Sequence, residues 1–234
     1  MSVNVLVLGG DGVNCETETA FIFDSLGAKS TIATANALLA NPDQLFEYDI
    51  LALPGGFSFG DEIRSGQVLA LKLSKIRPQI EQFIAHKKLI IGICNGMQVL
   101  TNLKLVKGSM RENIHGKFQN FWVKINVLDS PCVWTKGLPA TIELPIRHKE
   151  GNFQLATQED INFVQKNNLV ALEYLEDVNG AMFKTAGITD PSGQILALMP
   201  HPEAATDPKL NPLSNQSFGQ LIFKNAIDYI KGQK

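Results

Sequence analysis

Short stretches rich in Val, Ile, Leu and Ala alternate along the first half of the chain with stretches in which apolar residues recur at helical spacing. The short stretches have the length of strands and cover residues 3–8, 29–33, 50–53 and 89–93. Helical spacing is found over residues 16–26 and 67–75 and again after Pro78, and residues 42–46 have the pattern of a helical turn. This alternation predicts a parallel sheet with helices packed on both of its faces.

The pattern changes in the second half of the chain. Apolar and polar residues alternate over residues 123–127, residues 141–146 have an extended pattern, and residues 177–180 have the sequence of a hairpin-type turn. We therefore expect an antiparallel or mixed sheet attached to the parallel core. A further buried strand is predicted over residues 195–199, and an amphipathic helix is predicted from Phe218 onward.

Composition narrows the classes of protein to which this sheet can belong. With 234 residues and 44% hydrophobic content, the chain can bury a full core, and we expect one domain over residues 1–234. The formal net charge is −2 and no basic run is present, so neither nucleic acid nor a membrane is an expected partner. Three widely spaced cysteines argue against a disulfide framework and predict a reducing, cytoplasmic compartment.

The most informative stretch covers residues 88–100, where an apolar run meets a Gly-x-Cys-x-Gly turn and a helical pattern follows at once. This arrangement predicts a strand, a sharp turn and a helix, with Cys94 at the apex between Gly92 and Gly96. A cysteine just before a helix N-terminus is placed among N–H groups that stabilise a thiolate and a developing oxyanion. The alternative is a buried structural cysteine flanked by glycines needed only for packing.

Ligands of open parallel sheets bind at the carboxyl ends of the strands, so the loops that follow the predicted strands are candidate binding loops. The first contains Gly10 and Gly12, but Cys15 stands where a dinucleotide-binding fingerprint has its third glycine, and we expect no nucleotide there. Another contains Gly55 and Gly56, whose backbone freedom allows an N–H to be aimed into a neighbouring site. An ordinary tight turn is the alternative for this loop.

A histidine follows the last predicted strand. His201 stands between Pro200 and Pro202, which restrict its backbone, and Glu203 is close enough in sequence to orient the imidazole. A lone histidine at a strand end is often structural. If His201 lies on the same edge of the sheet as Cys94, however, it is a candidate general base.

These two segments carry a resemblance to a known family. The sequence Gly-Ile-Cys-Asn-Gly-Met-Gln over residues 92–98, together with His-Pro-Glu over residues 201–203, resembles the signature of the class I glutamine amidotransferases. The resemblance implies a Cys94, His201 and Glu203 catalytic triad. It also implies the class I glutaminase fold, a flavodoxin-like open parallel sheet with helices on both faces and an added antiparallel or mixed region.

The resemblance further assigns residues to the binding of glutamine. It implies that the backbone N–H groups of Gly56 and Asn95 form the oxyanion hole. It also implies that Gln98, Phe57 and Ser58 contact the substrate, and the position of Gln98 four residues after the nucleophile places it on the same helix face. A partly buried structural glutamine is the alternative for Gln98.

Partners and cofactors are also expectations of the resemblance. We expect no cofactor and no metal in this chain, and no Walker loop is present. ATP and magnesium are expected on a separate ATP-dependent synthetase subunit that receives ammonia, together with a small third subunit. Competing functions are another class I glutaminase, a cysteine peptidase or stress protein, and a non-catalytic regulatory module on the same fold.

The remaining polar candidates are weaker. Cys15 has no ordered base that sequence can identify and is expected to be a small buried residue. His86, His115 and His148 have no metal-ligand spacing with one another or with the cysteines. Arg64 follows the second glycine loop and could contact an anion, although a solvated arginine is the default expectation.

Overall fold

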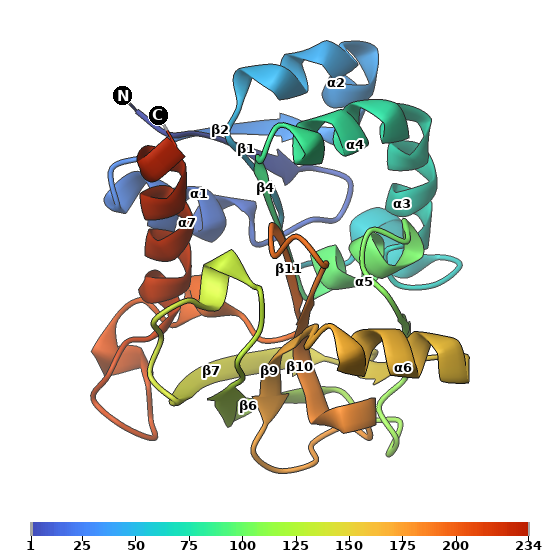
Figure 1. The fold of residues 1–234 in the computed structure, drawn as a ribbon, viewed down its shortest axis with the longest axis vertical. Coiled ribbons are helices and arrows are strands. Elements are labelled where there is room, and N and C mark those ends of the chain that lie inside the picture. Colours follow the sequence, from blue (N-terminus) through green and yellow to red (C-terminus); the bar gives the residue numbers. More distant parts are fainter. Residues whose placement is uncertain (1, 234) are drawn as a thin grey trace.

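The computed structural model describes residues 2–233, which form a mixed sheet with helices on both faces (Figure 1). The larger sheet has nine strands among these residues, in the order β2-β1-β3-β4-β11-β10-β9-β6-β7, and β5 pairs with β8 separately. The strands are β1 (Asn4–Gly9), β2 (Lys29–Thr34), β3 (Ile50–Leu53), β4 (Leu89–Ile93), β5 (Ser109–Arg111), β6 (Gln119–Val127), β7 (Thr141–His148), β8 (Asn152–Gln154), β9 (Val170–Tyr174), β10 (Thr185–Thr189) and β11 (Ile195–Leu198).

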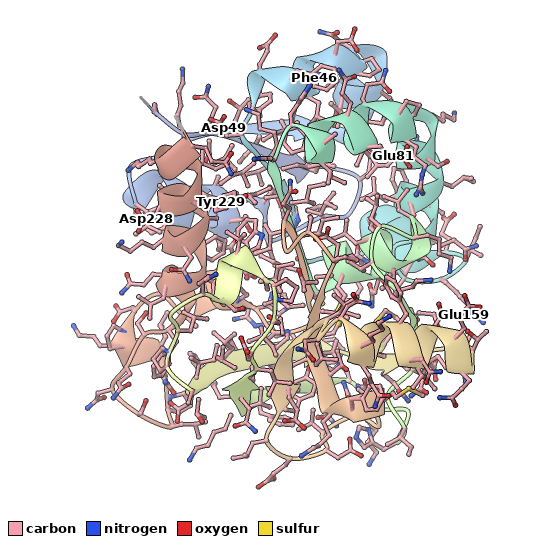
Figure 2. All side chains as sticks on the ribbon, viewed as in Figure 1. Phe46, Asp49, Glu81, Glu159, Asp228 and Tyr229 are labelled. Carbon is pink, nitrogen blue, oxygen red and sulfur yellow. The ribbon has the colours of Figure 1, made fainter. Side chains whose placement is uncertain are left out.

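The helices lie on the two faces of this sheet. Helices α1 and α7 lie together on one side, and α3, α5 and α6 lie on the other (Figure 1). The α-helices are α1 (Glu16–Ser25), α2 (Ala35–Ala40), α3 (Gln67–Leu73), α4 (Arg77–Ala85), α5 (Asn95–Asn102), α6 (Gln158–Lys166) and α7 (Gly219–Gln233). Short 3-10 turns cover Pro42–Glu47, Ser58–Asp61, Ser74–Ile76, Val133–Thr135, Met182–Lys184, Pro202–Ala204 and Pro208–Leu210. Side chains fill the space between the sheet and its helices (Figure 2).

The predicted change from a parallel to an antiparallel arrangement is confirmed. Strands β2, β1, β3, β4 and β11 pair in parallel, whereas β10, β9, β6 and β7 pair antiparallel with their neighbours. The predicted elements begin and end close to their expected positions, although β6 starts earlier, at Gln119. The flavodoxin-like part with an added antiparallel region is therefore the observed fold class.

The hairpin-type turn at residues 177–180 lies in the connection between the antiparallel strands β9 and β10. The carboxylate of Asp177 accepts hydrogen bonds from the backbone N–H groups of Asn179 at 3.3 Å and Gly180 at 2.7 Å. The connection is longer than a two-residue hairpin loop, because it also contains the 3-10 turn Met182–Lys184. The side chain of Asn179 then donates to the Gly151 carbonyl, so this turn supports the loop after β7.

The burial of each strand explains how apolar its sequence is. All residues of β3, β4 and β11 are buried, because these central strands are covered by helices on both faces. Strand β2 is mostly exposed, as an edge strand with one free side. None of the helices in residues 2–233 combines the length and the apolar composition that a membrane span requires.

Candidate active site

Cys94 occupies the turn between β4 and α5, so the predicted strand, turn and helix are confirmed. Its backbone has φ 51° and ψ −103°, a conformation that costs free energy in a residue with a Cβ atom. The strand and helix cross so closely that a Cβ atom on Gly92 would lie 2.6 Å from the carbonyl oxygen of Gly96. The two glycines therefore permit the turn that holds the Cys94 thiol just before the helix N-terminus.

His201 and Glu203 form a buried pair directly after β11. The imidazole Nδ1 lies 2.5 Å from Glu203 Oε1, and the side chains are only 3% and 1% exposed. The backbone N–H of His201 donates to the Pro145 carbonyl at 2.8 Å, which fixes the start of the turn. The sequence placed His201 and Glu203 together, and the structure shows that they are in hydrogen-bond contact.

The electrostatics of this pair favour the charged imidazole. Burial acts to lower the pKa of His201, but the negative charges of Glu203 and of a Cys94 thiolate outweigh it, so the pKa lies well above its usual value. With Nδ1 facing Glu203, the other nitrogen, Nε2, is buried and has no hydrogen-bond partner among the described residues. That nitrogen is free for proton exchange with a thiol.

Parallel pairing of β4 and β11 brings the cysteine to the histidine. Ile93 is paired with Leu198, and the backbone N–H of Cys94 donates to the Leu198 carbonyl at 2.7 Å. The Cys94 Sγ also lies 3.6 Å from the carbonyl oxygen of Arg147, at the end of β7. Residues far apart in sequence thus converge at one edge of the sheet, as expected for an open parallel sheet.

Cys15 lies closer to this pair than the sequence indicated. It is 8% exposed, as expected of a small buried residue, but its thiol, a ring nitrogen of His201 and a carboxylate oxygen of Glu203 all lie within 4.8 Å of one another. The sequence identified no ordered base for Cys15, and the structure shows that His201 lies beside it. Burial raises the pKa of the Cys15 thiol, although the neighbouring imidazole opposes this.

The reason for this approach is a contact between two loops. Val13 and Gly56 form an isolated antiparallel bridge, and the N–H groups of Asn14 and Cys15 both donate to the Gly55 carbonyl at 3.2 Å. The loop after β1 is thereby drawn across to the loop after β3. No spacing pattern in the sequence signals this cross-link, which is why the position of Cys15 was missed.

The two predicted oxyanion donors have free backbone N–H groups. Gly56 has φ 146°, and none of the hydrogen bonds found in residues 2–233 uses its N–H. In the bridge to Val13, the flanking residues make the hydrogen bonds, so the N–H of Gly56 points away from the ladder. Asn95 begins α5, where the first N–H groups have no partner within the helix.

The side chain of Asn95 connects helix α5 to the loop after β3. Its Oδ1 accepts from the N–H of Ser58 at 3.2 Å, and its Nδ2 donates to Gln98 Oε1 at 2.8 Å and to Asp61 Oδ1 at 3.2 Å. The Gln98 amide in turn donates to the Glu150 carbonyl at 2.8 Å. Gln98 is 4% exposed, and its amide links helix α5 to the loop after β7.

Phe57 and Ser58 have contrasting environments in the loop after β3. The Phe57 ring is 51% exposed, whereas Ser58 is 1% exposed and its hydroxyl has no hydrogen-bond partner within the described part of the chain. An unpartnered buried hydroxyl costs free energy until a partner arrives. Arg64, at the end of the same loop, is exposed.

The other histidines do not join the site. His148 is buried, and its Nδ1 pairs with Asn113 Oδ1 at 3.1 Å. Burial, assisted by the positive charges of His201 and His115, lowers the pKa of His148 to about 4. His115 contacts the Val178 carbonyl at 3.0 Å, and His86 packs edge-on against Phe46.

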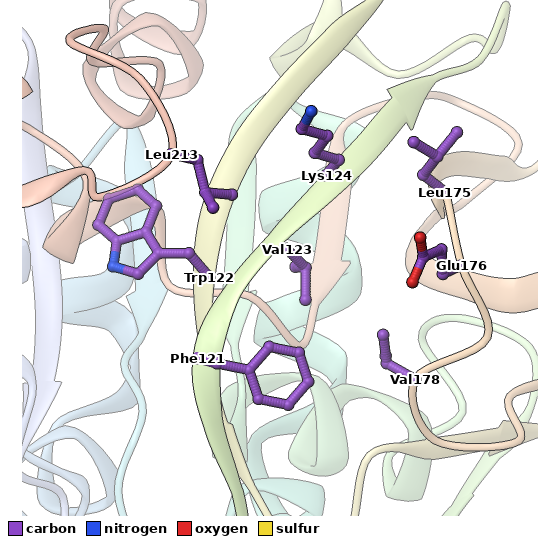
Figure 3. A pocket seen from close by; sticks show the side chains of 8 residues that line it. All are labelled: Phe121, Trp122, Val123, Lys124, Leu175, Glu176, Val178 and Leu213. Carbon is purple, nitrogen blue, oxygen red and sulfur yellow. The ribbon is translucent and has the colours of Figure 1, made fainter.

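A separate hollow of about 180 Å³ lies on β6, and none of the candidate catalytic or substrate-binding residues lines it. Figure 3 shows Trp122 beside Leu213, with Phe121 and Val178 at the other side of the strand. The titratable side chains in its lining are Lys124 and Glu176. The candidate catalytic residues therefore lie at the carboxyl edge of the parallel strands and not in this hollow.

The chain is similar to known proteins over nearly its whole length. Residues 2–230 match a family described as the CobB/CobQ-like glutamine amidotransferase domain. A protein of Methanococcus maripaludis described as phosphoribosylformylglycinamidine synthase subunit PurQ is 37% identical over 96% of both chains. A Campylobacter jejuni protein of the same description is 32% identical over 97% of this chain and 99% of the relative. A chain in the structure of PurLQS from Thermotoga maritima is 30% identical, with a TM-score of 0.83 over 98% of this chain and 99% of that one.

Proposed function

Because this chain belongs to the CobB/CobQ-like glutamine amidotransferase domain family, we propose that Cys94, His201 and Glu203 hydrolyse glutamine to glutamate and ammonia. The chain acts as a glutaminase subunit of phosphoribosylformylglycinamidine synthase, in purine biosynthesis. The observation that supports the proposed triad most directly is the buried His201–Glu203 pair next to a cysteine at the apex of a strained turn.

In the proposed reaction, the Cys94 thiolate attacks the side-chain carbonyl carbon of glutamine, and the amide nitrogen leaves as ammonia after accepting a proton from His201. A thioester remains on Cys94. Water activated by His201 then attacks the thioester and releases glutamate. Glu203 holds the imidazole through Nδ1, so that Nε2 faces the reacting atoms and the imidazolium is stabilised.

The oxyanion formed in each step would be met by the N–H groups of Gly56 and Asn95, which lack partners in the described chain. Ser58, with its unpartnered buried hydroxyl, and the exposed ring of Phe57 are the proposed contacts of the glutamine on the loop side. Gln98 takes part through its position beside Asn95, because its amide is held by Asn95 and by the Glu150 carbonyl.

The chain works in a complex with a synthetase subunit, as the PurLQS relative does. We further propose that ATP and magnesium bind to that partner, that a small third subunit takes part, and that the complex is cytoplasmic. Ammonia is the nucleophile that the synthetase needs, so a closed passage from Cys94 to the partner would prevent its protonation. Docking would order residues 55–64 and align Gly56 in the oxyanion hole.

The test is glutamine turnover by the isolated chain and by the chain with its synthetase, ATP and the formylglycinamide acceptor. We expect slow turnover alone and acceleration in the complex. A labelled thioester on Cys94, detected by mass spectrometry after acid quenching, identifies the nucleophile. Hydrolysis of peptides without any hydrolysis of glutamine would favour the peptidase alternative, and partner binding without turnover would favour the regulatory module.

A further inference from the structure

Cys15, His201 and Glu203 form a cluster that the proposed reaction does not use as a unit. Their ligand atoms lie within 4.8 Å of one another, and in residues 2–233 this is the one group of Cys, His and carboxylate side chains with metal-binding spacing. A Cβ atom on Gly55 would lie 2.7 Å from His201 Cε1 and 3.4 Å from both His201 Nδ1 and Cys15 Sγ, so the imidazole and the thiol both face Gly55. Because Glu203 Oε1 lies 2.5 Å from Nδ1, Nδ1 is the ring nitrogen that we assign to the cluster.

The cluster has unused capacity to bind a cation. Glu203 is 5% exposed, and its Oε2 is buried without a hydrogen-bond partner in the described chain. The Cys15 thiol makes a weak contact with Asn14 Oδ1 at 3.3 Å and interacts with the His201 imidazole. A buried, unsatisfied carboxylate oxygen is destabilising, and a cation placed there would remove that penalty.

The site can be reached from solvent. A cavity of about 400 Å³ is lined by Cys15, Glu203, Arg147 and Ala204 among others. The small side chain of Ala204 leaves this cavity open beside the carboxylate. Water in the cavity could supply a fourth ligand and complete a tetrahedron.

Charge balance and ligand type select the metal. Thiolate, imidazole and carboxylate ligands suit Zn²⁺, whereas Mg²⁺ and Ca²⁺ prefer oxygen ligands alone. A divalent cation with one thiolate and one carboxylate gives a neutral group, which lowers the cost of burial. Binding would release the proton of the Cys15 thiol and the Nδ1 proton of His201 to solvent.

We propose that Cys15, His201 and Glu203 form a zinc site that inhibits the enzyme reversibly when occupied. Zinc on Nδ1 replaces the hydrogen bond to Glu203 and forces the tautomer with hydrogen on Nε2. Because loss of this last ring proton would leave an imidazolate, Nε2 can neither protonate the leaving amide nitrogen nor accept a proton from water, and glutamine turnover stops. The inhibition rests on the proposed function of the triad, but the binding does not.

The binding test uses the full chain and Co²⁺ or Zn²⁺ alone. We expect one equivalent of Co²⁺ to give the near-ultraviolet band of a thiolate–cobalt bond, and calorimetry to show one equivalent of Zn²⁺. The matched variants are Cys15→Ala and Cys94→Ala. Cys15→Ala should weaken zinc binding at least about 100-fold, since loss of even an outer-shell partner costs up to about that much. Cys94→Ala should retain both the band and the affinity.

The activity test separates this site from zinc held by the catalytic cysteine. Zinc should inhibit glutamine turnover by the unmodified chain, and a chelator should restore it, whereas Cys15→Ala should keep measurable turnover that zinc leaves unchanged. Cys15→Ser, which preserves volume, replaces Cys15→Ala if circular dichroism shows that the alanine variant is unfolded. Loss of the cobalt band in Cys94→Ala but not in the Cys15 variants, or no stoichiometric binding at all, would overturn the proposal. Zinc binding by a chain that does not hydrolyse glutamine would instead refute only the proposed function.

Discussion

The α-carbon of Gly96 faces the backbone of Leu53 so closely that a Cβ atom on Gly96 would lie 2.0 Å from the Leu53 carbonyl oxygen. This contact joins the first turn of α5 to the end of β3, next to the loop that carries Gly56. Both sides of the contact are backbone, which cannot rotate away as a flexible side chain could. The turn that carries Cys94 and the loop after β3 therefore meet at one close-packed backbone contact.

The first prediction follows from this junction. Gly96→Ala should destabilise the chain by about 3 kcal/mol or more, because overpacking alone costs about 1–3 kcal/mol and here the backbone must move. Urea unfolding followed by circular dichroism measures the change. The matched control is Gly232→Ala, also in a helix, where a Cβ atom would meet nothing within 4 Å. The control should be neutral or slightly stabilising, and equal losses in both variants would contradict the argument.

The second prediction concerns the nucleophile. Cys94→Ala should abolish glutamine hydrolysis and thioester formation while the far-ultraviolet spectrum stays native, since the thiol is the attacking group in the proposed reaction. Cys15→Ala is the comparison, because Cys15 also lies near His201 but is not at the apex of the turn before α5. A dead Cys15 variant combined with an active Cys94 variant would show that the assignment of the nucleophile is wrong.

The third prediction separates the base from its orienting carboxylate. His201→Ala should lower the rate about 1,000-fold, within the range of about 100- to 10,000-fold for general acid–base catalysis, and Glu203→Gln should lower it less. Loss of the carboxylate should also lower the pKa of His201, because burial then acts with less opposition. Titration of the imidazole by NMR measures this shift. An unchanged pKa in Glu203→Gln would contradict the role given to the buried pair.

The fourth prediction is a pH dependence of stability caused by His148. Its pKa is about 4 in the folded chain and about 6.5 when unfolded, so the unfolded chain binds the extra proton first as pH falls. Stability is therefore complete above pH 6.5 and is lost progressively between pH 6.5 and 4, by up to about 3 kcal/mol. His148→Gln should flatten this part of the unfolding profile. The exposed His86→Gln should leave it unchanged.

Much of the parallel half was predictable because central strands are buried on both faces and read as continuous apolar runs. The strand 50–53 is predicted with its observed bounds, and the turn between β4 and α5 is predicted with Cys94 at its apex. His201 and Glu203 were also predictable, since a short sequence spacing held by two prolines leaves little freedom. In these cases local chemistry and long-range packing agree.

The remaining elements were harder to find because their stabilisation is not local. Helix α6 is mostly polar, yet its start has a signal in the sequence: Thr157 accepts from the N–H of Asp160 at 3.1 Å, and its hydroxyl contacts the Asp160 carboxylate. The two-stranded pair β5–β8 joins segments far apart in the chain and has no such signal. The position of Cys15 depends on the Val13–Gly56 bridge, which likewise exists only in the folded chain.

The parallel ladder between β4 and β11 has a consequence for sequence variation and for engineering. Ile93, one residue before Cys94, pairs directly with Leu198, three residues before His201. The distance between Cys94 and His201 is therefore set by the hydrogen-bonded register of these two strands. The intervening chain, including the whole antiparallel region, does not set it. Insertions in the surface loops of that region should therefore be tolerated by the catalytic geometry, whereas a one-residue deletion within β11 should misplace His201 while leaving Cys94 where it is.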